Sequence, residues 1–533
     1  DATGGLFGGH KSWARGIYID AGAFTVTFTG NTIENCRTAM NVDDYNNNVS
    51  ISGNTFNNNG TQISVGGATV PSGSFVMGAN DFINNAASTM VNLSNVAESF
   101  RLNIASSTLN GTPFSGLTNT QLFDVEARMA HKEVSSSKKG KVIYKAGNQY
   151  VNNFTVPVTK IDKIQNSIKY GDANDIINLE DGTYNEKLTV DKPNLTLQGV
   201  TNDKTLYILD GTGVADNGSG AGAKSGIKIN SGITNITIKD LTVQNHTGAS
   251  GNDDAGIYGI LSNNNLTVTN VALLSNSTAS GFYANGPIDN VSITNSMVTN
   301  NGGGARGIVI WNGLKTNIAI TGNMVTNNVC CGIELQDGDA SAVNVSGNTI
   351  NIGSGDNAIG LVGLNPTVGA NTVNSNIITG GGRFGIEIKN PAGGVTVNGN
   401  SVSLTTVNGD LRDRAGIAVF RRGVSGNNID VPNGVTITGN TVTGYTQTLP
   451  EEGFGIVIEG TNHVVTGNTV NNCNIGIQEQ GGAHANAYYP NLAGPDGTGN
   501  GASGVGLSPN YFGRGNAPFA CGNTIGPNTL SSN

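Results

Sequence analysis

Charged and aromatic residues are scarce in this chain of 533 residues, at 12% and 6% of the sequence. The net charge is −9, and the 28 lysines and arginines form no dense basic run, which argues against nucleic-acid binding. The sequence has no stretch of 18 apolar residues, so we expect no membrane-spanning helix. The chain opens at Asp1 without a charged and apolar leader, which indicates a signal peptide that is removed or lies outside this sequence.

Cysteine is also sparse, with five residues and none of the paired spacings that hold a metal. Cys330 and Cys331 are adjacent, precede a strand-like segment, and are expected to act as small, half-buried hydrophobic residues. Cys473 and Cys521 lie in similar local sequences near the end of the chain. A disulfide between these two is one alternative, and two separate thiols are the other.

Glycine, in contrast, is abundant, with 78 copies. It opens a phrase of glycine, isoleucine, any residue and an aliphatic residue, which recurs roughly every 20 to 40 residues. The phrase begins at Gly226, Gly307, Gly332, Gly385, Gly416, Gly455 and, more loosely, Gly476. Between its copies lies a second phrase, a valine or isoleucine followed by Thr-Gly-Asn-Thr. Both phrases are short, β-branched and alternate with period two, so they predict strands.

Two short strands per repeat at a regular period indicate a solenoid, here an all-β parallel β-helix. Glycine and asparagine between the strands tolerate the left-handed backbone of tight corners. Coils stacked about 4.8 Å apart place inward isoleucines in columns and allow corner asparagines to form amide ladders. The alternative is a disordered tract rich in glycine and asparagine, which the persistent isoleucine register disfavours.

The repeat is interrupted once, which predicts two tandem rods. Residues 1–120 carry the coils of a first rod, and residues 121–200 form a helical linker and the N-terminal cap of the second rod. Residues 201–480 form the main β-helix, and residues 481–533 form a long loop and a terminal coil. The first coils begin without a capping helix, so we expect either a longer parent protein or a partner at this end, including end-to-end self-association.

Helix formers gather only in the linker and cap region. Leu122, Val125 and Met129 outline one apolar helical face, and Ile164 and Ile168 outline a second, shorter one. A helix followed by strands is how a new β-helix would be started and capped, so this region is assigned as a cap.

Family resemblance enters at residues 182–188 (GTYNEKL) and 195–199 (LTLQG). These segments resemble the opening coil of pectin-methylesterase-like and pectate-lyase-like right-handed parallel β-helices. The Thr-Gly-Asn-Thr repeats resemble those of secreted carbohydrate-active enzymes and of large bacterial surface proteins. The resemblance implies a right-handed β-helix and a secreted, extracellular or cell-surface location. It implies no particular activity, because one β-helix supports many functions.

The catalytic motifs of pectin methylesterases, polygalacturonases and alginate epimerases are absent from the sequence, as is the nonapeptide calcium repeat. No organic cofactor is implied, and calcium is the one ion left open, because acidic turns supply the oxygen ligands that it prefers. The candidate calcium ligands are Asp253, Asp254, Asp337 and Asp339. His463 and His484 have no partner at metal-ligand spacing and are expected to face solvent.

In each Gly-Ile-x-Ile strand the isoleucines point inward, so the residues between them point outward and stack along one face. Between residues 306 and 459 this face gathers aromatic, acidic and basic side chains. Aromatic rings stack on sugars and arginine binds carboxylates in a bidentate manner, so the face is expected to contact a polysaccharide. The expected carbohydrate-binding residues are Trp311, Glu334, Glu387, Lys389, Arg414, Phe420, Arg421 and Glu459.

Two classes of function follow. The favoured hypothesis is a structural or adhesive cell-surface β-helix with a saccharide-facing side, such as a stalk, adhesin, filament or surface-layer element. The alternative is a carbohydrate-active enzyme, a polysaccharide lyase, epimerase or hydrolase, that acts along the 306–459 face. A lyase or epimerase needs a cation beside the uronate carboxylate and a base for the proton, whereas a hydrolase needs two carboxylates about 5 to 9.5 Å apart. The candidate catalytic residues are Arg421, Arg422, Lys389, Glu387 and Glu334.

Overall fold

The computed structural model describes residues 15–19, 25–43, 48–66, 75–83, 89–133, 137, 139–153, 163–216, 220–247, 254–259, 262–277, 280–302, 306–353, 355–362, 370–380, 382–405, 413–420, 432–447, 453–480 and 523–531. Within these ranges the chain is an all-β parallel solenoid with two short α-helices, which confirms the predicted fold class. No helix in this part of the chain is long and apolar enough to cross a membrane.

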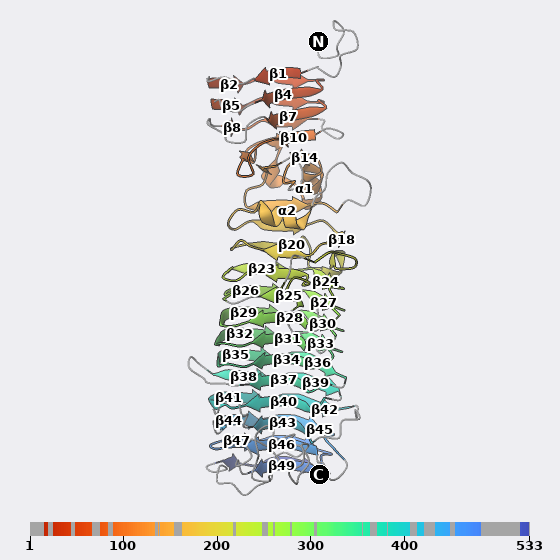
Figure 1. The fold of residues 1–533 in the computed structure, drawn as a ribbon, viewed down its shortest axis with the longest axis vertical. Coiled ribbons are helices and arrows are strands. Elements are labelled where there is room, and N and C mark those ends of the chain that lie inside the picture. Colours follow the sequence, from red (N-terminus) through yellow and green to blue (C-terminus); the bar gives the residue numbers. More distant parts are fainter. Residues whose placement is uncertain are drawn as a thin grey trace. The chain divides into compact units, whose positions relative to one another are not determined.

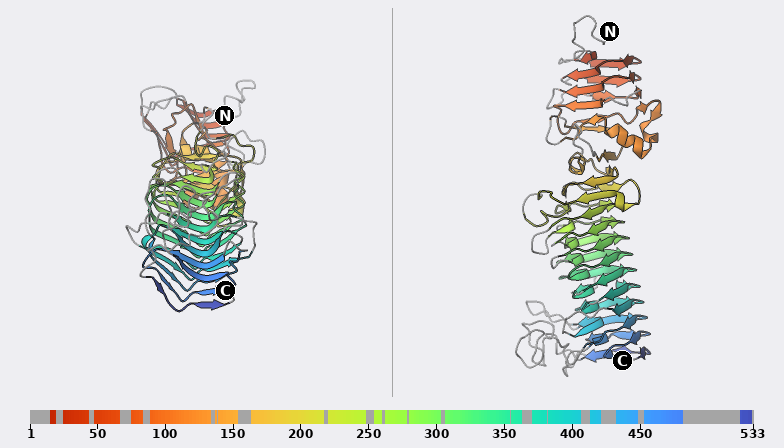
Figure 2. Two further views of the ribbon diagram at one scale, coloured as in Figure 1. Left: turned by 60° about the horizontal axis from the view of Figure 1, so that its bottom comes forward. Right: turned by 90° about the vertical axis from the view of Figure 1, so that its right-hand side faces the viewer.

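The chain divides into two compact units (Figures 1 and 2). Unit 1 comprises Asp1–Tyr184 with Asn194–Asn202, and unit 2 comprises Asn185–Pro193 with Asp203–Asn533. The interpretation of the chain as two tandem rods stays a prediction.

Unit 1 is built from short strands that pair in parallel with the equivalent strand of the next coil, except for the antiparallel pair β12–β13. One sheet has the order β1 (Arg15–Ile19), β4 (Thr38–Asp43), β7 (Thr61–Gly66), β10 (Thr89–Ser94), β14 (Met129–Ala130). A second sheet has the order β2 (Thr25–Thr29), β5 (Asn48–Ser52), β8 (Phe75–Met77), and a third has the order β13 (Thr112–Pro113), β12 (Thr108–Leu109), β9 (Asp81–Ile83), β6 (Thr55–Asn57), β3 (Thr32–Glu34). Strands β11 (Arg101–Asn103) and β15 (Lys141–Ile143) form a pair. Strands β16 (Asn148–Val151), β17 (Ile176–Leu179) and β20 (Thr196–Gly199) are neighbours in that order. Unit 1 also contains β18 (Gly182–Tyr184).

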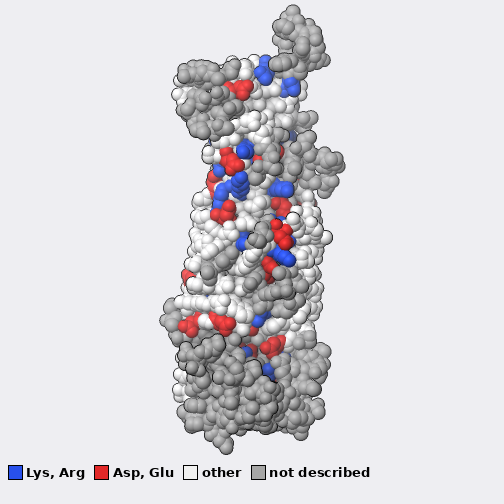
Figure 3. Space-filling view, in the orientation of Figure 1, with Lys and Arg blue, Asp and Glu red and all other residues white. Residues whose placement is uncertain are grey.

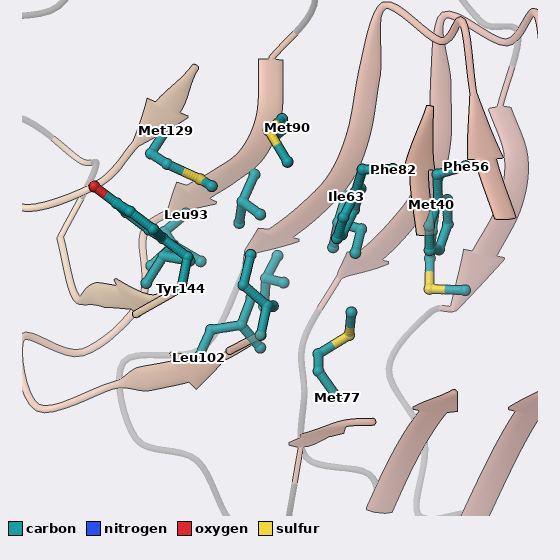
Figure 4. Close-up of a cluster of buried hydrophobic side chains, with 14 of the residues drawn as sticks. Met40, Phe56, Ile63, Met77, Phe82, Met90, Leu93, Leu102, Met129 and Tyr144 are labelled. Carbon is teal, nitrogen blue, oxygen red and sulfur yellow. The ribbon is translucent and has the colours of Figure 1, made fainter. Parts of the chain in front are cut away.

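The core of unit 1 repeats the same residue types from coil to coil (Figure 4). Phe56 and Phe82, on successive coils, stack with ring centroids 5.5 Å apart, and both are fully buried. Val42 and Val65 are likewise in register and fully buried. Like residues therefore pack on like residues, as a stacked coil requires.

The two predicted helices are present but short. Helix α1 (Asn119–Glu126) begins at a capping box in which Thr118 and Gln121 bond to each other's backbone N–H groups. It ends before Met129, which lies in β14 and pairs with Val91, so the predicted helical face was too long. Helix α2 (Ile164–Lys169) buries Ile164 and Ile168 as predicted.

Unit 2 consists of three parallel sheets, each of which receives one strand per coil (Figure 1). Sheet A has β23 (Ile236–Lys239), β26 (Leu266–Thr269), β29 (Ile288–Thr294), β32 (Lys315–Thr321), β35 (Ala340–Ser346), β38 (Asn371–Asn374), β41 (Ala392–Asn398), β44 (Asn433–Thr438), β47 (Val464–Thr466) and β50 (Thr524–Ile525). Sheet B has β21 (Tyr207–Asp210), β24 (Thr242–Gln244), β27 (Ala272–Leu274), β30 (Met297–Thr299), β33 (Met324–Thr326), β36 (Thr349–Ile352), β39 (Ile377–Gly380), β42 (Ser401–Leu404), β45 (Thr441–Thr443), β48 (Thr469–Asn471) and β51 (Thr529–Ser531). Sheet C has β19 (Leu188–Val190), β22 (Ile227–Ile229), β25 (Ala255–Gly259), β28 (Ser280–Asn285), β31 (Arg306–Trp311), β34 (Cys331–Gln336), β37 (Asn357–Val362), β40 (Phe384–Lys389), β43 (Arg414–Phe420), β46 (Gly453–Glu459) and β49 (Ile475–Gln480).

The glycine of each Gly-Ile phrase is required by space. A Cβ added at Gly385 would lie 2.2 Å from Cγ1 of Val402 and 2.6 Å from the carbonyl oxygen of Gly416. At Gly416 it would lie 2.2 Å from Cγ1 of Val442 and 2.8 Å from the carbonyl oxygen of Gly455. The core valine and the next coil thus leave no room for a side chain. In contrast, the glycine of Thr-Gly-Asn turns a corner with a positive φ, 63° at Gly439.

Corner asparagines form the amide ladder that the sequence predicted. The side-chain N–H of each member donates to the side-chain oxygen of the next, over 2.9 Å from Asn376 to Asn400 and from Asn400 to Asn440. The members are Asn323, Asn348, Asn376, Asn400, Asn440, Asn468 and Asn528. Each Nδ2 also donates to a backbone carbonyl, as that of Asn376 does to Val345. The ladder therefore satisfies polar groups that the corner buries.

Candidate functional site

The outer face of sheet C carries the predicted columns of side chains. The register pairs Val309 with Glu334, Glu334 with Gly360, and Gly360 with Glu387. Glu334 and Glu387 thus share one column and lie two coils apart, as the period of the repeat indicated. A separation of roughly 10 Å for two coils is marginal for a pair of hydrolytic carboxylates.

Most predicted binding residues on this face are buried, although the sequence predicted an open surface. The buried set is Glu334, Glu387, Lys389, Arg414, Phe420 and Glu459. Trp311 differs from them in being half-buried. Charged side chains rarely lie inside a protein without partners, because desolvation of a charge is costly. The face therefore divides into a partly open region near Trp311 and a closed region near Glu387.

At the partly open region, Arg306 organises three side chains. Its guanidinium carbon lies 4.6 Å from the centre of the Trp311 ring, in a cation–π contact. The same guanidinium forms an ion pair with Glu334 and donates a hydrogen bond of 3.1 Å to the side-chain oxygen of Gln336. Trp311 stands in register with Asn285 on the preceding coil and with Gln336 on the following one. An indole flanked by two amides is thereby held in one orientation.

Two tyrosines extend the neighbouring column, that of Val309 and Glu334, toward the start of unit 2. Tyr258 and Tyr283 stack with ring centroids 5.2 Å apart and an interplanar angle of 10°. Both are buried, and they form one apolar cluster with Val309 and Trp311. The sequence analysis missed Tyr283. It follows Gly281-Phe282, a variant of the Gly-Ile phrase with phenylalanine in place of isoleucine, and could have been found from that variant.

At the closed region, Glu387 and Lys389 form an ion pair of 2.9 Å. The Asn357 side chain donates a hydrogen bond of 3.0 Å to the other carboxylate oxygen of Glu387. Burial raises the pKa of Glu387, while Lys389 acts against this rise and Asp356 adds to it. A carboxyl group that is easier to protonate suits a general acid. The sequence analysis missed Asn357, although it directly precedes Ala358-Ile359.

Further buried charges lie at the starts of β40 and β43. The Arg383 side chain donates a hydrogen bond of 2.9 Å to the backbone oxygen of Asp413, and its guanidinium carbon lies 5.0 Å from the centre of the Phe384 ring. Arg414 is fully buried, and Phe420 packs edge-on against Phe384 at 5.7 Å. On the face displayed in Figure 3, the charged side chains form separate patches between uncharged areas. The Arg383 guanidinium thus lies against an aromatic ring of the closed region.

Among the calcium candidates that the structure describes, Asp337 and Asp254 accept hydrogen bonds from other residues of the chain. The ammonium of Lys315 donates to the backbone oxygens of Asp337, at 2.7 Å, and of Gly313, at 3.0 Å. Burial lowers the pKa of Lys315 to about 8, while the carboxylates of Asp337 and Asp339 oppose this. Asp254 is buried and accepts from the backbone N–H of Lys224 at 3.2 Å. Among the described residues no cluster of three metal-ligating side chains occurs.

Some expected residues lie outside the described residues, namely Asp253, Arg421, Arg422, His484 and Cys521. Their roles stay predictions, and so does calcium binding.

His463 was wrongly expected to face solvent. It is fully buried; its Nδ1 accepts from the backbone N–H of Val435 at 3.1 Å, and its Nε2 lies 2.9 Å from the backbone oxygen of Glu459. This arrangement uses the neutral imidazole, and burial lowers its pKa.

The cysteines also differ from expectation. Cys330 and Cys331 form a disulfide with each other rather than acting only as small hydrophobic residues. Cys331 stands in register with Arg306, so this disulfide lies beside the partly open region. Cys473 is a buried thiol that bonds to the backbone oxygen of Asn471 at 3.4 Å.

Comparisons with known proteins show similarity in fold only. No family model and no curated protein matches this chain. The A-module of the mannuronan C-5 epimerase AlgE6 of Azotobacter vinelandii matches with 16% identity and a TM-score of 0.35, over 67% of this chain and 91% of that chain. Pectin methylesterase PemA from Erwinia chrysanthemi matches with 13% identity and a TM-score of 0.25, over 55% and 78%. The Dettilon tailspike protein matches with 14% identity and a TM-score of 0.29, over 61% and 66%. Likenesses of this size concern the β-helix architecture alone.

Proposed function

We propose that this chain is a polysaccharide-binding β-helix protein of the cell exterior, and that it contacts its glycan at the partly open region of sheet C. The observation that carries the proposal is the orientation of Trp311, which is fixed by the Arg306 guanidinium and remains half-buried. A rigid indole offers a sugar ring a stacking surface at little entropic cost. The neighbouring Asn285 and Gln336 supply amides that can bond to hydroxyl groups.

A neutral or uronate-containing polysaccharide fits this region better than a protein or nucleic-acid partner. The chain has few charges and no basic run, and the Arg306 charge is already paired with Glu334. Repeated coils also present similar groups at a regular spacing of about 4.8 Å, which suits an extended, repetitive ligand. A stalk, adhesin or filament would use such a surface without chemistry.

A second candidate function is polysaccharide lyase, epimerase or hydrolase activity at the closed region. The specific observation in its favour is the burial of Glu387 beside Lys389, which raises the pKa of the carboxyl group. A buried carboxyl group with a raised pKa beside a basic group is frequent at catalytic sites, although structural ion pairs show it too. The residues would act as a proton donor and a counter-charge for a uronate.

One screen separates the two candidates. The purified chain is tested against a panel of neutral and acidic polysaccharides, with and without added calcium, for binding and for new reducing ends or unsaturated uronates. The proposal expects binding of at least one polysaccharide that Trp311→Ala abolishes, without product. Product that disappears in Glu387→Gln, while binding is retained, would establish the enzyme instead. Absence of both signals would refute both candidates.

A further inference from the structure

The outer face of sheet A carries a regular array of small polar side chains. Two outward positions alternate with buried core residues on each of seven consecutive strands from β26 to β44. The first column contains Thr267, Ser292, Ala319, Asn344, Thr372, Thr396 and Thr436. The second column contains Thr269, Thr294, Thr321, Ser346, Asn374, Asn398 and Thr438. All of them except Ala319 are threonine, serine or asparagine, and none is charged or aromatic.

The array is ordered by the backbone and by its own hydrogen bonds. The Thr294 hydroxyl donates to that of Thr269 at 2.8 Å, one coil away. The Thr438 hydroxyl donates to the side-chain oxygen of Asn398 at 3.1 Å. Threonine is stiff at χ1, so a column of threonines holds its methyl and hydroxyl groups at defined positions. The array is half-exposed or exposed throughout, and is therefore available to a ligand.

The chemistry of this face excludes the usual partners. The two columns offer no aromatic ring for a sugar to stack on, no charge for an acidic or basic partner, and no apolar patch for a protein hot spot. Asp289 of β29 lies outside the columns, and its carboxylate accepts hydrogen bonds from Thr316 and Asn317. What the columns do offer is a neutral lattice of hydroxyl and amide groups. The lattice repeats about every 4.8 Å from coil to coil and about every 6.6 Å along each strand. A matching ligand must itself be neutral, rigid and periodic.

Ice meets these conditions. Hydrogen-bonded water oxygens lie about 2.75 Å apart, and tetrahedral geometry then places second neighbours about 4.5 Å apart, close to the coil spacing. We propose that the outer face of sheet A between β26 and β44 binds the surface of ice. The threonine methyl groups and hydroxyls order a layer of water that continues into the crystal, because each bound water retains its hydrogen bonds. This inference is independent of glycan binding on sheet C.

The test is the capture of the labelled full-length chain by a slowly growing ice hemisphere, with ice recrystallisation as a second readout. Thr294→Tyr and Thr321→Tyr place bulky side chains in the middle of the array. Thr299→Tyr places the same side chain on the half-exposed outer face of sheet B and is the matched control. Thermal melting followed by circular dichroism verifies that each variant is folded before it is compared.

The proposal expects the wild-type chain and Thr299→Tyr to enter the ice and to slow recrystallisation equally. Thr294→Tyr and Thr321→Tyr should reduce capture about tenfold or more, which corresponds to ~1.4 kcal/mol. Trp311→Ala should leave capture unchanged. Wild-type capture no greater than that of serum albumin would overturn the proposal, and so would full capture of both array variants. Retention on crystalline cellulose or chitin that these two variants abolish, without ice capture, would also overturn it.

Discussion

Glu387 and Lys389 stand two residues apart on β40 with their charged groups 2.9 Å from each other, and the carboxylate is fully buried. Both side chains point away from the isoleucine core, toward the side of the strand that the repeat would normally leave in water. Removing a charge from water costs several kcal/mol, which an ion pair with further hydrogen bonds offsets. The pair thus shows that the outer face of sheet C is closed to water at β40.

Removing one partner of this pair should destabilise unit 2 strongly. Lys389→Met leaves a buried carboxylate without its cation, and we expect the free energy of unfolding to fall by about 3 kcal/mol or more. The double variant Glu387→Gln with Lys389→Met should recover most of the loss. Lys239→Met, at a half-exposed pair with Asp240, serves as the control and should change stability by less than about 0.5 kcal/mol. Urea unfolding measures all three, and equal losses for Lys389→Met and Lys239→Met would contradict the prediction.

His246 should make the chain sensitive to mild acid. It is fully buried, and burial lowers its pKa from 6.5 to about 4. Because the folded pKa is depressed, the unfolded chain takes up the proton first, so stability is present above pH 6.5 and is lost as the pH falls toward 4. The full loss is about 3 kcal/mol.

The matched variant is His246→Asn, because the backbone N–H of His246 already bonds to the side-chain oxygen of Asn276 at 3.2 Å, as a ladder asparagine would. Melting temperatures measured between pH 7 and pH 4 should fall less steeply for this variant. Parallel curves for the variant and the wild-type chain would show that His246 does not carry the acid sensitivity.

The asparagine ladder should be most sensitive in its middle. In Asn376→Ala, the buried side-chain oxygen of Asn400 and the backbone oxygen of Val345 each lose a donor. We expect a loss of about 3 kcal/mol, since each unsatisfied buried group costs about 1–3 kcal/mol. Asn528→Ala, at the last and more exposed rung, should cost about 1 kcal/mol. Similar losses at the two rungs in chemical unfolding would argue that the ladder is incidental.

Gly416 should not tolerate even a methyl group. A Cβ there meets the core valine Val442 and the backbone of Gly455, so Gly416→Ala forces the coils apart. The expected loss is about 1–3 kcal/mol. Gly353 is the control, because a Cβ at that position has no atom within 4 Å. A Gly353→Ala variant should melt at the wild-type temperature, and a Gly416→Ala variant that does likewise would disprove the steric explanation of the repeat.

The fold could be predicted from the sequence because the repeat encodes it locally. The glycine of the Gly-Ile phrase, as at Gly385 and Gly416, lies where successive coils are in close contact. The asparagine of Thr-Gly-Asn is the residue that forms the corner ladder. The length of helix α1 could not be predicted, because Met129 fits the helical period equally well but lies in a strand that pairs with Val91. The local sequence pattern does not show where pairing with a distant strand overrides helix propensity.

The candidate site could be predicted only in part. The two-residue alternation within each strand determines which side chains point outward, so Trp311, Glu334 and Glu387 were assigned to the correct face. Burial could not be predicted, because it depends on how side chains of successive coils pack against one another, as Phe384 and Phe420 do. The burial of His463 and the pairing of Arg306 with both Trp311 and Gln336 depend on contacts between coils, which a single repeat does not reveal.

The most direct test of the central claim is the affinity of wild type and Trp311→Ala for the polysaccharide that the screen identifies. If Trp311 provides the stacking surface, the variant should bind about tenfold more weakly or worse, a loss of ~1.4 kcal/mol, while it remains folded at the temperature of the binding assay. Trp311→Phe should retain most of the affinity, because it keeps an aromatic face. Equal affinity of Trp311→Ala and wild type, with both folded, would contradict the account.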